Sequence, residues 1–176
     1  VSSTPSGFIN DPSPDFKGSA EINSKVDLFL DGELIGTVSA DSSGQWSYTD
    51  KSLKLRDGVY QLTVRAADQV GNQSVESEPL SFTLDTRLPR ITSADVAPAF
   101  DENIGDNQLI YTVTSDDELP VTYSIDDTDS FSVDPLSGDV RFRLNPDHED
   151  PAQPRSFVVT AHDQAGNSAE QDVRLD

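Results

Sequence analysis

The sequence predicts an all-β protein built from two tandem antiparallel β-sandwiches, and three observations lead to this prediction. Apolar residues alternate with polar ones, as in 60–66 and 157–161, which is the period of a strand with one buried face. Turn dipeptides such as Asp31-Gly32 and Ser137-Gly138 separate these strands at short intervals. Finally, one nine-residue sequence motif occurs twice, at 64–72 and at 159–167. No long segment shows the 3.6-residue period of an amphipathic helix.

The repeated motif indicates how the chain is divided into domains. Residues 64–72 and 159–167 share Val, Ala, Asp, Gln and a final Gly-Asn pair, at an offset of 95 positions from Val64 to Val159. Each copy follows an alternating strand, so we expect two modules of about 90 residues, a size at which a sandwich can have its own core. We assign 1–17, with three prolines, to an incoming linker, 18–86 to the first module and 87–176 to the second.

The charge of the chain excludes several classes of partner. There are 32 acidic against 12 basic residues, which gives a net charge of −20 and a pI near 4.1. Binding to nucleic acid or to an anionic membrane surface requires clustered Lys and Arg, so neither partner is expected. No run of 18 apolar residues occurs, so no membrane insertion is expected either. The acidity indicates either solubility and adaptation to salt, or a need for cations.

Catalytic signatures are missing from the sequence. There is no Cys and therefore no thiol nucleophile, disulfide framework or Cys-ligated zinc. The two histidines, His148 and His162, do not accompany a serine in a nucleophile elbow, and no phosphate-binding loop appears. Aromatic residues make up only 7% of the chain, which does not favour a sugar-binding cleft. We expect that the protein is not an enzyme.

The first module resembles the bacterial Ig-like repeats of large surface adhesins. The similarity is carried by 26–38, 41–48, 55–60 and 67–72. Within it, Asp57 to Leu62 resembles the tyrosine corner of immunoglobulin sandwiches, in which the Tyr hydroxyl bonds the backbone upstream. That resemblance implies a corner at Tyr60. Trp46 is expected to lie in the core between the sheets.

The second module resembles bacterial cadherin-like repeats. Phe100-Asp101-Glu102-Asn103 is similar to the opening of that family, 123–138 to its central strands, 145–149 to its Asp-x-Glu motif and 161–163 to its Ala-x-Asp motif. In cadherins these acids bind calcium between successive domains, so the resemblance implies calcium as the cofactor. The family's Asp-x-Asp motif falls on Ser115-Asp116-Asp117, where the first Asp is replaced by Ser.

Calcium takes six to eight oxygen ligands, and no single loop of this chain supplies them, so the ligands must come from separate loops. In a sandwich the last hairpin lies near the incoming linker, which places Asp163 near Asp116 and Asp117. The predicted junction site consists of Asp57, Asp85, Asp116, Asp117 and Asp163. The predicted site at the far end of the second module consists of Glu102, Asp147, Glu149 and Asp176. By symmetry, Asp68 would face an earlier repeat with Asp11 or Asp15. For each acid the alternative is a turn residue that bonds its own loop.

These expectations favour a stalk segment of a calcium-dependent bacterial adhesin, acting in adhesion and biofilm formation at the cell surface. Its partners would be the neighbouring repeats of the same chain, with a host or surface ligand bound elsewhere in the full protein, and the chain would be monomeric. Two alternatives remain open. The pair could be a binding module that holds a sugar or protein through its apical loops. It could also be an accessory pair of a secreted polysaccharide-degrading enzyme.

Overall fold

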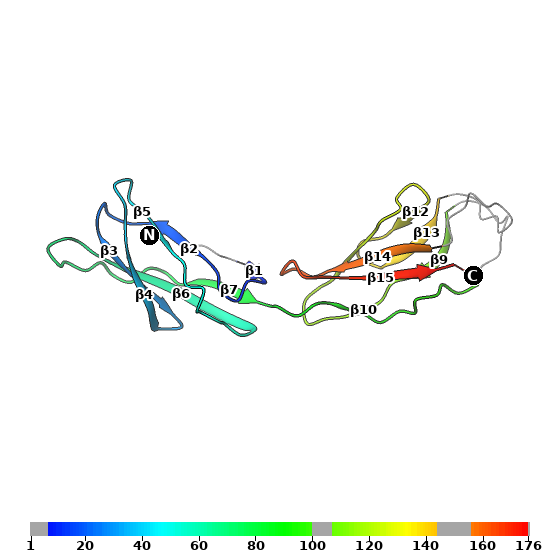
Figure 1. The fold of residues 1–176 in the computed structure, drawn as a ribbon, viewed down its shortest axis with the longest axis horizontal. Helices are drawn as coiled ribbons and strands as arrows, with labels where there is room; N and C mark the ends of the chain where they lie inside the picture. The colour runs from blue at the N-terminus through cyan, green and yellow to red at the C-terminus, as the bar shows by residue number, and fades with distance from the viewer. Residues whose placement is uncertain (1–6, 100–106, 144–155, 176) are drawn as a thin grey trace. The chain divides into compact units, whose positions relative to one another are not determined.

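The computed structural model describes residues 7–99, 107–143 and 156–175, and within these ranges it contains strands and turns without a helix. The prediction of an all-β fold is therefore confirmed. The chain divides into two compact units, Val1–Thr86 and Arg87–Asp176, which are described separately below (Figure 1). No helix long and apolar enough to cross a membrane occurs in the part of the chain that the structure covers.

The first unit is a sandwich of a five-stranded and a two-stranded sheet. Its strands are β1 (Gly7–Ile9), β2 (Phe16–Ser19), β3 (Lys25–Leu30), β4 (Glu33–Ser39), β5 (Gln45–Tyr48), β6 (Gly58–Ala67) and β7 (Leu80–Leu84). The larger sheet has the order β1-β7-β6-β3-β4, and β2 pairs with β5 in the other. All pairs are antiparallel except β1 with β7, which run parallel.

The core of the first unit follows the period-two pattern of the sequence. Alternate residues of β3 and β6 are buried, and they pack against aromatic side chains from β2, β5 and β7. The buried cluster consists of Phe16, Val26, Leu28, Leu30, Trp46, Leu62, Val64 and Phe82. Trp46 is 3% exposed, as expected for a residue packed between the sheets.

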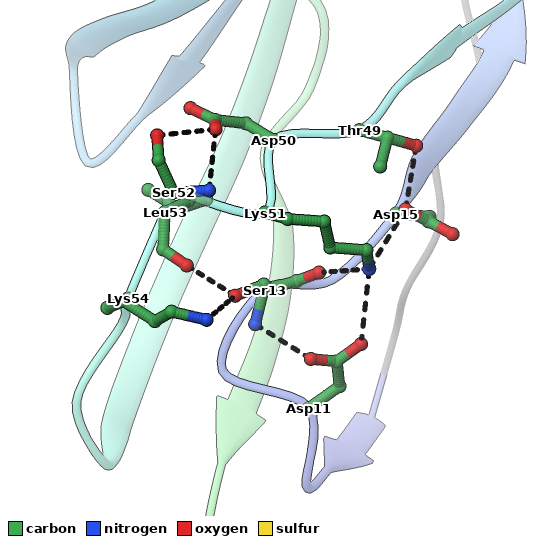
Figure 2. A network of polar contacts seen from close by, with 9 residues as sticks. All are labelled: Asp11, Ser13, Asp15, Thr49, Asp50, Lys51, Ser52, Leu53 and Lys54. Atoms are coloured by element: carbon green, nitrogen blue, oxygen red, sulfur yellow. Dashed lines mark hydrogen bonds and ion pairs between the residues drawn. The ribbon is translucent and has the colours of Figure 1, made fainter.

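The N-terminal boundary of the first unit differs from the sequence-based assignment of 1–17 to a linker. Gly7–Ile9 forms β1, and Phe16 is fully buried in the core. The Pro-rich segment between them is a turn rather than a linker, because Pro12 C=O accepts a hydrogen bond of 2.9 Å from Leu55 N–H. Ser13, also buried, donates its hydroxyl to the C=O of Leu53 (Figure 2). A three-residue strand is too short to show a periodic pattern, which is why the sequence did not reveal it.

The tyrosine corner is present. The hydroxyl of Tyr60 donates to Arg56 C=O at 2.8 Å and accepts from Arg56 N–H at 3.2 Å. The ring of Tyr60 stacks on Phe82, with centroids 5.5 Å apart. The corner thereby ties the turn before β6 to the core of the first unit.

Within its described residues, the second unit has eight strands in three sheets. They are β8 (Arg90–Ile91), β9 (Gln108–Thr112), β10 (Ser115–Asp116), β11 (Thr122–Ile125), β12 (Phe131–Val133), β13 (Asp139–Phe142), β14 (Ser156–His162) and β15 (Ser168–Arg174). The sheet orders are β11-β14-β15, β12-β13-β9 and β10-β8. Their inward faces enclose one apolar cluster: Ala97, Ile110, Tyr111, Val113, Ile125, Phe131, Val140, Phe142, Phe157, Val159, Val173 and Leu175.

The segment between β8 and Ala99 is tied to both faces of the second unit. Ala94 C=O accepts hydrogen bonds from the Tyr111 hydroxyl and, at 2.9 Å, from the Gln171 amide. Val96 then forms a parallel bridge with Arg174. These bonds hold the first part of the unit against its last strand.

Replacing Tyr60 and Tyr111 by phenylalanine, one at a time, tests the contribution of each hydroxyl to stability. Tyr60→Phe removes the corner bonds, and Tyr111→Phe removes the bond to Ala94. Each loss is expected to destabilise its own unit by about 1 kcal/mol, the usual net value of one hydrogen bond. Urea unfolding followed by circular dichroism measures this, and each variant serves as the control for the other. A Tyr60→Phe variant of unchanged stability would show that the corner contributes packing alone.

Candidate metal centre

The repeated motif, 64–72 and 159–167, forms the same hydrogen-bonded loop in both units. In the first, Asp68 Oδ1 accepts from Asn72 N–H at 2.8 Å and Oδ2 accepts from the Asn72 amide at 2.7 Å. In the second, Asp163 makes the same two bonds to Asn167, also at 2.8 and 2.7 Å. The Asp N–H also donates to the Asn C=O, at 3.0 Å and 3.1 Å respectively. The Asp therefore closes the loop between two strands in each unit.

The role of the two asparagines was missed in the sequence, where Gly-Asn was interpreted only as a turn signal. Gly71 and Gly166 have φ of 93° and 92°, a conformation that side chains other than glycine rarely adopt. The glycine turns the chain so that the Asn side chain can reach back to the carboxylate. The spacing Asp-x-x-Gly-Asn, repeated in both modules, was the signal that could have revealed this contact.

The two loops differ in the acidic neighbour that their carboxylate meets. In the second unit, carboxylate oxygens of Asp163 and Asp117 lie within 4.8 Å of each other. Asp163 follows β14 and is 8% exposed, while Asp117 follows β10 and is half-buried. Asp117 Oδ1 also accepts from Leu119 N–H at 2.7 Å. Asp116 is exposed, and its backbone pairs with Arg90.

The Asp117–Asp163 pair has the chemistry and spacing that a calcium ion requires. Calcium–oxygen distances of about 2.3–2.6 Å allow two ligands of one ion to lie up to about 5 Å apart. A carboxylate has about four lone-pair positions, so the loop hydrogen bonds leave room for a metal. Without a cation, two negative charges at this distance repel by about 3 kcal/mol at an effective dielectric constant near 20.

Asp57 and Asp85 lie at the end of the first unit where the chain leaves it. The Asp57 carboxylate accepts from the N–H and the hydroxyl of Thr86, both at 2.9 Å. Asp85 is buried, and its N–H donates to Ile9 C=O at 2.9 Å. Asp57 thus fixes Thr86, the last residue of the first unit, by hydrogen bonds. Asp85 extends the hydrogen bonding between β1 and β7 by one residue.

The other predicted ligands do not form a second group of acids within the ranges that the structure covers. Asp68 bonds Asn72, whereas Asp11 and Asp15 lie 3.9 and 3.6 Å from Lys51 Nζ (Figure 2). The four acids of the far-end site lie outside the described residues: Glu102, Asp147, Glu149 and Asp176.

Comparison with known proteins supports the assignment of the first unit. Residues 2–86 match the family model of the bacterial Ig-like domain. No curated protein sequence matches the chain.

Solved structures of cadherin repeats are similar to the chain. They include Drosophila N-cadherin EC1-3, with 21% identity, a TM-score of 0.45 and coverage of 98% of this chain and 64% of that chain. Mouse cadherin-23 EC22-24 has 19% identity, a TM-score of 0.43 and coverage of 96% and 60%. The human desmocollin-1 ectodomain has 13% identity, a TM-score of 0.43 and coverage of 100% and 39%. The chain thus spans less than two thirds of the length of each of these structures.

Loop hydrogen bonds lower the pKa of several carboxyl groups. The pKa of Asp68 lies below its ordinary value chiefly because the Asn72 side chain donates to it. The pKa values of Asp50, Asp127 and Asp134 also lie below the ordinary value of 3.8. The main cause is a hydrogen bond from the Ser52 hydroxyl to Asp50, from Ser130 N–H to Asp127 and from Ser137 N–H to Asp134. Each bond favours the charged form, which is the form present in the folded loop at neutral pH.

Acid is therefore expected to destabilise the protein. A carboxyl group whose pKa is lower in the folded state stabilises it above the unfolded pKa of about 4, and the contribution is lost as pH falls further. The thermal midpoint should stay level from about pH 7 to 5 and fall below about pH 4. Thermal unfolding by circular dichroism across this range measures it. Relief of the repulsion within a chain of net charge −20 would have the opposite sign, so a rising midpoint below pH 4 would contradict the prediction.

Proposed function

We propose that the chain is an extender segment of a bacterial cell-surface adhesin, in which calcium stiffens the junction between successive repeats. The observation that carries this proposal is the Asp117–Asp163 pair, whose carboxylate oxygens lie within 4.8 Å of each other. The pair belongs to the two loops of the second unit that the sequence assigned to the incoming end.

Chain connectivity supports Asp85 as a third ligand. Asp116 pairs with Arg90, so the residues that precede Arg90 leave β8 beside Asp117. Pro89 is only four positions after Asp85 in the chain, a span of at most about 14 Å even when fully extended. Calcium would supply positive charge that turns the repulsion among these carboxylates into attraction. An ion shared by ligands on both sides of residue 86 would restrict rotation at that point.

The remaining features agree with a structural role outside the cell. The bacterial Ig-like and cadherin-like folds are typical of binding and structural domains, and such domains are typical of extracellular proteins. His162 Nε2 lies 2.9 Å from Ser124 Oγ on the neighbouring strand, a cross-strand contact that does not involve an acid. We infer that the chain has no catalytic role, works as a monomer beside neighbouring repeats, and projects a ligand-binding part located elsewhere in the full protein.

Replacing Asp163 by Asn tests the metal centre against a matched control. Asp68→Asn makes the same change in the equivalent loop of the first unit, and within the described residues Asp68 does not belong to a group of three or more acids. In the wild type, calcium at 100 times its dissociation constant adds about 2.7 kcal/mol and raises the thermal midpoint by about 10 °C or more. Asp163→Asn should remove most of this rise, and Asp68→Asn should retain it.

The measurement is thermal unfolding in millimolar calcium and again in excess chelator, with magnesium held constant. Both substitutions disturb the same loop hydrogen bonds, but Asp163→Asn also relieves the repulsion from Asp117, so without calcium it should destabilise its unit less than Asp68→Asn does. If calcium gives no rise in the wild type, or an equal rise in both variants, then Asp163 is a loop residue only and the metal centre is wrong.

A further inference from the structure

The segment that joins the two units, residues 86–89, is anchored at both of its ends. Thr86 is held in the first unit by its two hydrogen bonds to a carboxylate. On the other side Pro89 is buried, and Arg90 begins β8 of the second unit. Arg87 and Leu88 lie between these anchors, and both are exposed. The freedom of the joining segment therefore depends on these two residues.

Each of the two residues is restrained in a different way. Leu88 precedes a proline, and the proline ring confines the residue before it to extended backbone. Arg87 is restrained by a contact, since its guanidinium donates a hydrogen bond to the Glu118 carboxylate and forms an ion pair with it. This ion pair attaches the exposed part of the joining segment to the loop that follows β10.

Glu118 belongs to the same tight turn as the candidate ligand Asp117. Asp117 Oδ1 accepts from Leu119 N–H at 2.7 Å, which closes a turn with Glu118 in its middle. Asp85, the proposed third ligand, is two positions before Arg87, a span of at most about 7 Å. A contact that holds Arg87 at this turn therefore limits how far Asp85 can move from Asp117.

We infer that Arg87 is a positioning residue of the metal centre, which pairs with Glu118 and so keeps the Asp85 carboxylate near those of the second unit before calcium binds. This inference rests on the proposed function and adds to it a residue that supplies no ligand atom. A positive charge near a calcium site repels the ion, so charge alone would disfavour an arginine here. Pre-organisation has the opposite effect, because a ligand that is already confined loses less freedom when the ion binds.

These opposite signs allow Arg87→Gln to separate the two effects. If Arg87 acted only through its charge, its removal would tighten calcium binding. If Arg87 positions the joining segment, its removal should weaken binding by about two- to fivefold, which is what an exposed ion pair contributes at most. Both side chains are largely exposed, at 62% and 74%, so a larger effect is not expected. Isothermal titration of the whole chain with calcium measures the dissociation constant.

Three further variants serve as controls. Arg90→Gln makes the same change of charge at an exposed residue that forms no ion pair within the described part of the chain, and it should leave calcium binding unchanged or tighter. Arg87→Lys keeps a cation that can reach Glu118 and should retain most of the wild-type affinity. In a Glu118→Gln background the pair is already absent, so Arg87→Gln should no longer weaken binding.

A measurement without calcium tests the ion pair on its own. In excess chelator, the nitrogen-15 relaxation order parameters of residues 87 and 88 should fall in Arg87→Gln and stay at the wild-type level in Arg90→Gln. Circular dichroism checks that both units remain folded in each variant.

The possible failures can be told apart. Calcium binding by Arg87→Gln that equals or exceeds that of the wild type would overturn the inference, and so would an equal loss in the Glu118→Gln background. Unchanged order parameters in chelator would also overturn it, because the ion pair would then not restrain the segment. A wild type that binds no calcium would instead overturn the proposed function, and the positioning role would fall with it.

Discussion

Both units depend on carboxylates that accept hydrogen bonds from backbone N–H groups in loops. A protein made of short strands has many turns, and each turn leaves donors that no ladder satisfies. Asp41 accepts from the N–H groups of Ser43 and Gln45, and Asp134 accepts from those of Leu136 and Ser137. Asp126 extends the same principle across the sheet by accepting from Val158 N–H at 2.8 Å. Loop geometry in this protein is therefore set largely by ionised acids.

Because many of these carboxylates bond their own loops, the net charge of −20 is not by itself a sign of cation binding. Acids that close loops need no metal, so acidity alone does not indicate a cation site. The loops of Asp68 and Asp163 make the distinction clear, since their hydrogen bonds agree to within 0.1 Å. What separates them is Asp117, which brings a second negative charge beside Asp163.

Much of the fold was predictable because its strongest signals are local. Period-two alternation identified the buried faces of β3, β6 and β14, and the Asp57–Leu62 pattern identified the Tyr60 corner. The three-residue strand β1 was not predictable, since its pairing with β7 joins segments more than 70 positions apart and leaves no period in the sequence. Sandwich topology indicated that Asp117 and Asp163 would meet. The contact of Asp57 with Thr86 was not foreseen, because it depends on the path of the chain after β7 rather than on a motif.

The parallel pairing of β1 with β7 also governs how such a unit can be joined to others. In an antiparallel terminal pair the two chain ends would emerge side by side, so the unit could be inserted into a loop of another domain. Here the start of β1 and the end of β7 lie at opposite ends of the pair. Copies of such a unit can therefore follow one another head to tail along a chain, and each new copy adds its own length.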